Sequence, residues 1–245
     1  MKIIIFCAML LLSAYPAQAQ HTAPATGAHT EGAHASATSQ QTEAAIAKLY
    51  ELHFWTGKTY SLRDDANRQA IIAFQKLAGL PRTGKLNDST IARISEASSS
   101  PAMLPTAHDQ LHAQHIEVDL DHQVLFVVDP QDQVNRILPV STGSGQLFDD
   151  SSKGKVYART PRGNFKVYNK VSGWKKSPLG LLFDPMYFTG GFAVHGANDV
   201  PAKPASHGCI RIPMFAAAEM YRVTPVGTPV IVYGQNPKPA SLANK

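Results

Sequence analysis

The spacing of apolar residues changes near residue 115, and this change divides the chain. Between residues 42 and 98, apolar residues recur with the spacing of one helical face. From about His115 onward they alternate with polar residues, as in strands that bury one face. We therefore expect a small all-α N-terminal module over 42–98 and a mainly β domain over 115–234.

The first of these regions predicts three short helices. One helical face is formed by Ile46, Leu49, Tyr50 and His53. Asp64 or Asp65 can cap a second helix over 66–78, and Asn87 or Asp88 can cap a third. The least specific interpretation of these helices is a module that only packs on the β domain.

The second region predicts many short strands and one helix. Strands are expected over 116–120, 124–128, 134–140, 165–171, 192–194 and 229–233. The strand over 116–120 alternates with Glu117 and Asp119, which predicts one solvated face. Turn residues over 143–162 predict a mobile loop, and Pro213 suits the start of a helix over 213–222. Closely spaced short strands favour a mixed β sandwich with one helix over alternating βαβ units.

The N-terminal residues have the pattern of an export signal. Lys2 precedes an apolar run over 3–12, and Ala17-Gln18-Ala19 fits the small residues of a cleavage site. The run is too short to span a bilayer. We expect a signal peptide over 1–19 and no transmembrane segment after its removal. The protein would then be periplasmic in a Gram-negative host and extracellular in a Gram-positive one.

The remaining segments predict linkers. Residues 20–41 contain almost no large apolar side chains, which is typical of a disordered linker. Residues 99–114 carry Pro101 and Pro105 and predict a second linker. Residues 235–245 are expected to form a C-terminal tail.

The net charge of the chain and its distribution limit the kinds of partner that the protein is expected to bind. The net charge is +5 and the pI is about 9.2, but the basic residues are scattered along the chain. Since no basic block is interleaved with aromatic residues, we expect no nucleic-acid partner. A mildly positive surface suits an anionic polymer such as a cell wall, or serves solubility alone.

The chemistry of the chain is concentrated around Cys209. The other cysteine, Cys7, lies in the expected signal peptide, so an exported protein carries one unpaired thiol. In an oxidising compartment such a thiol suggests a nucleophile. A nearby imidazole would take its proton, and both His207 and His195 qualify, because spacing alone favours neither. Gly208 permits close substrate approach, and its amide and that of Cys209 can face a developing oxyanion.

Two less specific explanations compete with catalysis at this site. A single cysteine is often a buried structural residue with incidental histidines nearby. His195, His207 and Cys209 also have the ligand types of a zinc site, but no fourth ligand is evident. His21, His29 and His34 fit no fixed coordination geometry either. We expect neither a metal nor another cofactor.

Two motifs resemble known families. His195-Gly196, followed by Ser206-His207-Gly208-Cys209-Ile210-Arg211, resembles the signature of the L,D-transpeptidases with the YkuD-type catalytic domain. The similarity extends over 115–233 and includes the segments 140–143, 160–165 and 190–195. Residues 43–97 resemble a three-helix peptidoglycan-binding module through Phe74-Gln75, Gly79-Leu80, Thr83-Gly84 and Thr90.

The resemblance implies roles for the reacting residues. Cys209 would be the nucleophile and His195, rather than His207, the general base and acid. The backbone carbonyl of Gly196 would orient the imidazole, in place of the carboxylate of a Ser-His-Asp triad. His207 would shape the oxyanion region together with the amides of Gly208 and Cys209. Position 196 is Gly where some relatives have Ser, which costs little if only the backbone acts there.

The resemblance also implies substrate contacts. Arg211 would meet a substrate carboxylate or organise the loop, and Ser206 belongs to the same substrate-binding string. Tyr187 would line the donor pocket, or would simply pack against neighbouring aromatic rings. A cysteine nucleophile of this family is further expected to be acylated by carbapenems.

The reaction implied by the resemblance is a two-step acyl transfer on peptidoglycan. The thiolate would attack a stem tetrapeptide, and an amine of a neighbouring diamino acid would resolve the thioester into a 3→3 crosslink. A lysine of a lipoprotein is the other acceptor to consider. A hydrolase on the same scaffold, such as an L,D-carboxypeptidase or endopeptidase, and a non-catalytic wall-binding protein remain as alternatives.

Overall fold

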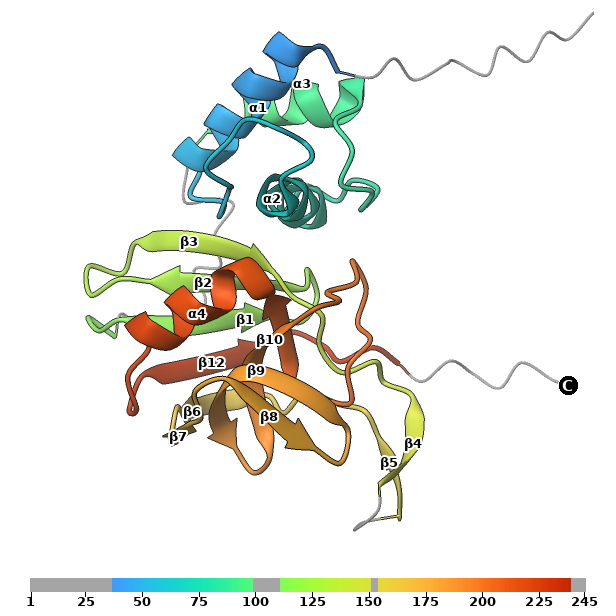
Figure 1. The fold of residues 1–245 in the computed structure, drawn as a ribbon, viewed down its shortest axis with the longest axis vertical. Coiled ribbons are helices and arrows are strands. Elements are labelled where there is room, and N and C mark those ends of the chain that lie inside the picture. The colour runs from blue at the N-terminus through green and yellow to red at the C-terminus, as the bar shows by residue number, and fades with distance from the viewer. Residues whose placement is uncertain (1–36, 99–110, 151–153, 239–245) are drawn as a thin grey trace, which may run out of the picture. The chain divides into compact units, whose positions relative to one another are not determined.

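The computed structural model describes residues 37–98, 111–150 and 154–238 (Figure 1). The expected signal peptide over 1–19 and the three histidines of the first linker lie outside the described residues, as do the segments 99–110 and 239–245. In the ranges that are described, no helix combines the length and the hydropathy needed to cross a membrane.

Three helices form the N-terminal module, as predicted. They are α1 (Ser39–Glu51), α2 (Asp65–Leu77) and α3 (Asp88–Glu96). Side chains at their N-termini accept from the first-turn amides: Thr38 from Gln41, Asp64 from Ala66 and Asn87 from Thr90.

The start of α1 corrects the expected first linker. The linker was predicted to run from residue 20 to 41, whereas the helix already begins at Ser39. Thr38 and Gln41 form a capping box, in which the side chain of each accepts from the backbone amide of the other. The capping box starts the helix before the first large apolar residue. A prediction based on apolar content therefore places the start of the helix too late.

The first sheet of the β domain has the strand order β3-β2-β1-β12-β6. Its strands are β1 (His115–Asp119), β2 (Val124–Val128), β3 (Val134–Pro139), β6 (Gly163–Lys166) and β12 (Pro229–Tyr233). Strands β1 and β12 pair in parallel, and every other pair in this sheet is antiparallel.

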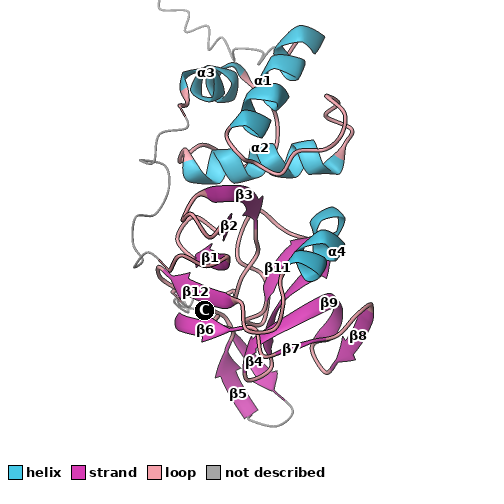
Figure 2. Cartoon of the chain, turned by 90° about the vertical axis from the view of Figure 1, so that its left-hand side faces the viewer, coloured by secondary structure: helices cyan, strands magenta, loops and turns pink. Residues whose placement is uncertain are grey.

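The second sheet carries the strands that lead to the cysteine. Its order is β11-β10-β9-β7, with β8 paired to β9. The bounds are β7 (Asn169–Lys170), β8 (Trp174–Ser177), β9 (Gly180–Thr189), β10 (Phe192–Ala197) and β11 (Ile210–Pro213). Helix α4 (Met214–Val223) follows β11 directly (Figure 2).

A single apolar core joins the two sheets and α4. Buried residues from both sheets meet there, among them Ile116, Val118, Val194, Ile210 and Val230. Ala216, Ala217 and Met220 of α4 complete this core. The expected mixed β sandwich with one helix is therefore confirmed.

The loop predicted over 143–162 contains a hairpin instead. Strands β4 (Leu147–Asp150) and β5 (Gly154–Tyr157) pair antiparallel within it. The strand expected over 165–171 is divided between β6 and β7, and β8 and β9 were not predicted. Exposed apolar residues on these hairpins, including Leu147, Tyr157, Trp174 and Leu181, obscure the alternation from which strands are inferred.

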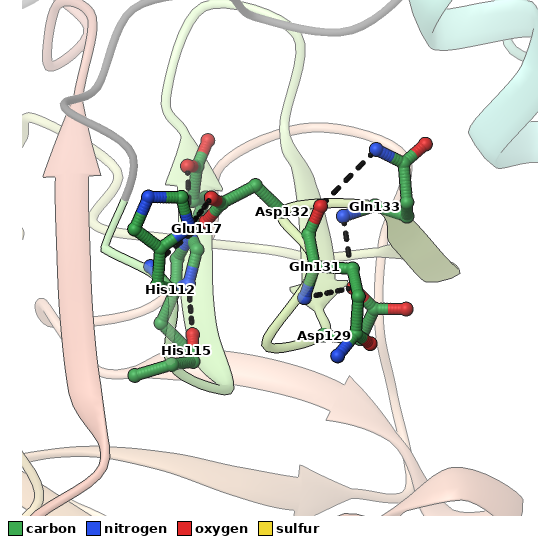
Figure 3. A network of polar contacts seen from close by, with 8 residues as sticks. His112, His115, Glu117, Asp129, Gln131, Asp132 and Gln133 are labelled. Atoms are coloured by element: carbon green, nitrogen blue, oxygen red, sulfur yellow. Dashed lines mark hydrogen bonds and ion pairs between the residues drawn. The ribbon is translucent and has the colours of Figure 1, made fainter.

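Strand β1 is buried along its whole length, which contradicts the solvated face predicted for it. Glu117 is only 6% exposed, and its carboxylate lies 3.1 Å from His115 Nε2 (Figure 3). Asp119 accepts from the backbone amides of Asp121 and His122. Glu117 and Asp119 are thus buried together with hydrogen-bonding partners. The alternation of apolar and charged residues in the sequence cannot reveal such partners.

Helix α2 packs on the first sheet and shares a core with it. Phe74 and Ile71 of the helical module belong to the same buried cluster as Val124 and Phe126 of β2 and Ile137 of β3. The backbone also connects the two parts, because the amide of Trp55 donates to the carbonyl of Ile137 over 3.0 Å. The helical module is therefore packed against the β domain rather than tethered to it.

The segment expected as a tail after residue 234 is partly integrated into the β domain. The amide of Thr160 donates to Asn236 Oδ1 over 2.8 Å, and Asn236 Nδ2 donates to the carbonyl of Thr160 over 2.9 Å. Gln235 donates its amide to Asp121. The domain therefore continues past its predicted end.

Candidate active site

A pocket of about 640 Å³ lies beside Cys209. Six of the residues singled out from the sequence line it: Tyr187, His195, Ser206, His207, Cys209 and Arg211. The two remaining candidates, Gly196 and Gly208, are neighbours of lining residues in the chain. The structure thus brings together side chains from three strands and one loop.

The parallel pairing of β10 with β11 aligns the reacting residues. His195 is the register partner of Arg211, and Val194 is the partner of Ile210. Partners in a parallel pair point to the same face, and side chains two positions apart share that face. Cys209 immediately precedes β11 and lines the same pocket as Arg211 and His195.

A backbone hydrogen bond fixes the tautomer of His195. Its Nδ1 lies 2.9 Å from the carbonyl oxygen of Gly196, which can only accept. In the neutral imidazole, Nδ1 therefore carries the proton and Nε2 carries the lone pair. The contact that the resemblance implied is present, and it leaves Nε2 able to act as a base.

Burial keeps this imidazole neutral. His195 is 5% exposed, and burial lowers its pKa to about 4. The Gly196 carbonyl opposes this shift, whereas the positive charge of Arg211 adds to it. His195 is therefore an uncharged base at neutral pH.

The thiol is half-buried and also uncharged. Burial raises the pKa of Cys209, while a backbone hydrogen bond with Ala193 and the charge of Arg211 act in the opposite direction. Its Sγ lies 3.9 Å from the carbonyl oxygen of Gly191. The pKa shifts of Cys209 and His195 thus favour a neutral thiol and a neutral imidazole over a thiolate–imidazolium pair.

Gly208 occupies a conformation that only glycine adopts easily. Its φ is +137°, and a Cβ there would lie 2.4 Å from Phe192 Cε1 and 2.7 Å from the carbonyl oxygen of Arg159. Its amide donates to Ser206 Oγ over 2.9 Å. We predicted that the Gly208 amide would face an oxyanion. In the structure this amide donates to the Ser206 hydroxyl instead.

Ser206 organises the loop from within. Its Oγ also donates to the carbonyl of Cys209 over 2.6 Å, and its side chain is 3% exposed. Thr160 Oγ1 donates to the carbonyl of Gly208 over 2.8 Å. Ser206 lines the pocket, but these bonds commit its hydroxyl to the loop rather than to a substrate.

Gly196 is constrained by packing as well as by its carbonyl. A Cβ at this position would lie 2.6 Å from Ala217 Cβ and 3.1 Å from Met214 Sδ, both on α4. The serine found in some relatives therefore does not fit here without movement of α4. The departure noted from the sequence has a steric reason.

The other predicted residues, His207, Tyr187 and Arg211, also line the pocket. The exposed ring of His207 meets Phe148 edge-on, with centroids 4.6 Å apart. Tyr187 packs against Tyr168 at 6.3 Å, and burial together with the nearby Cys209 raises its pKa. Within the described residues, the guanidinium of Arg211 has no carboxylate partner.

Sequence reasoning missed an apolar wall and the acidic groups of the pocket. Trp174, Leu179, Leu181 and Leu182 of the β8–β9 hairpin form the wall, and Asp150 and Asp199 also line the pocket. The signal in the sequence was the group of leucines around Gly180, a glycine typical of a turn. The structure exposes 61% of Leu181, which makes it part of an apolar surface. Across the described ranges, no three His, Cys, Asp or Glu side chains are placed to share a metal ion.

Known proteins share this fold and this region of sequence. The YkuD L,D-transpeptidase catalytic domain matches residues 113–232. An L,D-transpeptidase structure from Xylanimonas cellulosilytica is 34% identical, with a TM-score of 0.68 over 79% of this chain and 93% of that one. One from Stackebrandtia nassauensis is 22% identical, with a TM-score of 0.49 over 82% of this chain and 94% of that one. None of the curated proteins compared with this chain matches it.

The first of these similarities extends beyond the catalytic region. Its 79% coverage is more than residues 113–232 can supply, so it includes residues N-terminal to the β domain. The matched region, residues 113–232, does not include the helical module, whose resemblance to peptidoglycan-binding modules stays a prediction. On its sequence, its fold and the residues gathered around Cys209, the chain belongs to the L,D-transpeptidase family.

Proposed function

We propose that this protein is a cysteine-dependent L,D-transpeptidase acting on peptidoglycan stem tetrapeptides in the cell wall, in the periplasm of a Gram-negative host. The supporting observation is that Cys209 and His195 line one pocket. The hydrogen bond from Nδ1 to Gly196 leaves Nε2 of His195 as the base. A nucleophile, a base and an orienting group are the parts that acyl transfer requires.

In the first step, Cys209 Sγ attacks the carbonyl carbon of the L-centre before the terminal D-alanine. His195 Nε2 takes the thiol proton as the carbon–sulfur bond forms. The imidazolium then gives this proton to the D-alanine nitrogen as the carbon–nitrogen bond breaks. The products are free D-alanine and a thioester on Cys209, with His195 neutral again.

In the second step, a primary amine attacks the thioester carbonyl. His195 Nε2 takes a proton from the amine and returns it to the departing sulfur, which restores the thiol. A diamino-acid side chain of a neighbouring stem gives a 3→3 crosslink, and a lipoprotein lysine gives an attached protein. The carboxylate of Asp199 on the pocket lining attracts an acceptor amine in its ammonium form, which loses one proton to solvent before the neutral amine attacks.

The rest of the lining accounts for donor binding. Arg211 offers a positive charge to a stem carboxylate, because no described carboxylate neutralises it. Tyr187 and the wall around Trp174 cover the aliphatic part of the stem and limit the access of water. Limited access of water favours an amine acceptor over hydrolysis.

The test combines muropeptide analysis with intact-mass detection of the acyl-enzyme. Purified protein and a Cys209→Ala variant are each incubated with disaccharide tetrapeptides. The proposal expects crosslinked dimers and a thioester mass shift from the natural protein, and neither from the variant. Shortened monomers alone would assign a hydrolase, and full activity in the variant would refute the cysteine mechanism.

A further inference from the structure

Lys76 is a buried amine for which the helical module alone gives no reason. It lies on α2 and is 1% exposed. Its Nζ donates to the carbonyls of Val140 over 2.8 Å and Gln123 over 3.0 Å, both in the β domain. Burial and the nearby charge of Arg82 lower the pKa of Lys76 to about 7. The two acceptors match the two protons of a neutral amine.

One of the two carbonyls belongs to Gln123, just before β2, and the other belongs to Val140, just after β3; the amide of Val140 donates to the carbonyl of Gln123 over 2.9 Å. Gln123 adopts a φ of +61° and continues the contact through its side chain. Its Nε2 donates to Thr142 Oγ1 over 2.7 Å, and the Thr142 amide donates to Gln123 Oε1 over 3.0 Å. Lys76 thus holds the backbone of a residue whose side chain holds Thr142.

Thr142 in turn holds the loop that carries the nucleophile. Its carbonyl accepts from the amides of Ala205 over 3.0 Å and Ser206 over 2.9 Å. Ser206 Oγ then contacts the backbone of Gly208 and Cys209. An unbroken series of hydrogen bonds and covalent bonds therefore joins α2 to the nucleophile.

The neighbouring segment makes a second connection to the same loop. The amide and carbonyl of Ser141 pair with the carbonyl and amide of Arg211 at 3.1 and 3.0 Å. Ser141 Oγ donates to the carbonyl of Lys203 over 2.8 Å. The segment after Val140 is thus bonded to the catalytic loop both before and after Cys209.

The helical module also touches this loop directly. Arg82 Nη1 donates to the carbonyl of Ala202 over 3.2 Å. Ala202 lies between the ends of β10 and β11, in the stretch that carries Cys209. Two basic side chains of the module therefore connect to the loop: Lys76 through Gln123 and Val140, and Arg82 directly at the backbone of Ala202.

We propose that Lys76 is a positioning residue of the transpeptidase, which fixes the segment after Val140 and thereby the loop of Cys209, with Arg82 as a second contact. The helical module then helps to position the active-site loop, in addition to any role in binding the cell wall. This proposal rests on the proposed function, since it concerns the rate of acyl transfer by Cys209.

The experiment compares Lys76→Met with Lys85→Met in the purified protein. Methionine keeps an unbranched apolar stem and removes both donors at position 76, whereas Lys85 is exposed and its side chain forms no hydrogen bond or ion pair with the β domain among the described residues. Active sites are counted by acyl-enzyme stoichiometry, and kcat is expressed per active site. We expect Lys76→Met to lower kcat about tenfold with KM within about twofold, and Lys85→Met to change neither.

A purely structural role for Lys76 gives a different result. It predicts fewer active sites and lower stability at unchanged kcat per site, and that result would overturn the proposal. If Lys76→Met does not fold, the half-buried Arg82→Gln decides, with an expected fall in kcat of about threefold at unchanged KM. A wild-type protein without acyl transfer would overturn the proposed function as well, whereas an active wild type with unaltered variants would overturn only this proposal.

Discussion

Substitution of Gly208 by alanine is the sharpest test of the loop geometry. The added Cβ would lie 2.4 Å from Phe192 Cε1, whereas ordinary contact begins at 3.4 Å, so the ring must move by about 1 Å. The carbonyl oxygen of Arg159, at 2.7 Å, belongs to the backbone and gives way less easily. The loop therefore moves, and Cys209 moves with it.

The size of the effect follows from that displacement. An error of about 1 Å in the position of a reacting group costs about 100-fold in rate. The backbone strain of a non-glycine residue at a φ of +137° adds about 1–3 kcal/mol of lost stability. We expect Gly208→Ala to fold with reduced stability and to form its acyl-enzyme about 100-fold more slowly.

Gly163→Ala is the matched control. Its φ is +131°, and a Cβ there meets nothing closer than Phe165 Cζ at 3.6 Å. Both variants carry the same backbone strain, but only Gly208→Ala forces its neighbours apart. Acyl-enzyme formation is followed by intact mass, and stability is followed by urea unfolding of the same samples. Rates for the two variants that agree within about threefold would refute the steric reasoning.

Three further predictions concern charge and packing. Because the pKa of His195 is about 4, kcat/KM should stay constant down to about pH 5, and an acid limb near pH 6.5 would contradict the buried neutral base. Gly196→Ser should lower the free energy of unfolding by about 1–3 kcal/mol in urea, and an additional Ala217→Gly should recover part of it; no recovery would contradict the steric explanation. Burial lowers the pKa of His115, but hydrogen bonds with Glu117 and a backbone carbonyl outweigh it and raise the pKa overall. The stability that this histidine contributes is thus complete below its unfolded pKa of about 6.5 and is lost as pH rises through its folded pKa. His115→Gln should therefore lower the free energy of unfolding in urea by more at low pH than at high pH. Equal losses at the two pH values would exclude this linkage.

The parts of the fold that depend on neighbouring residues could be predicted from the sequence. The starts of α2 and α3 follow from Asp64 and Asn87, whose side chains bond amides two or three residues away. Strand β2 is a continuous apolar run and is buried throughout, as such a run predicts. In these elements the cause and the effect lie within a few positions of each other.

The parts that depend on distant residues could not be predicted from pattern alone. The choice of His195 over His207 required the family resemblance, because the register of β10 with β11 sets it. Glu117 is buried with the imidazole of His115, on the same strand, as its partner. The alternation of apolar and polar residues gives no sign of this pairing and predicts that Glu117 faces solvent. Lys76 looks like any lysine of an amphipathic helix, since its acceptors lie 47 and 64 residues away.

The electrostatics of the pocket favour the neutral form of the proposed nucleophile, Cys209, and of the proposed base, His195. Burial raises the pKa of Cys209 and lowers that of His195, so proton transfer from sulfur to nitrogen is unfavourable in the free site. Arg211 does not reverse this order, because its positive charge favours the thiolate but disfavours the imidazolium. In the proposed mechanism we therefore expect the proton to leave sulfur as the new carbon–sulfur bond forms. Since oxidation proceeds through the thiolate, we expect the same burial to slow the oxidation of Cys209.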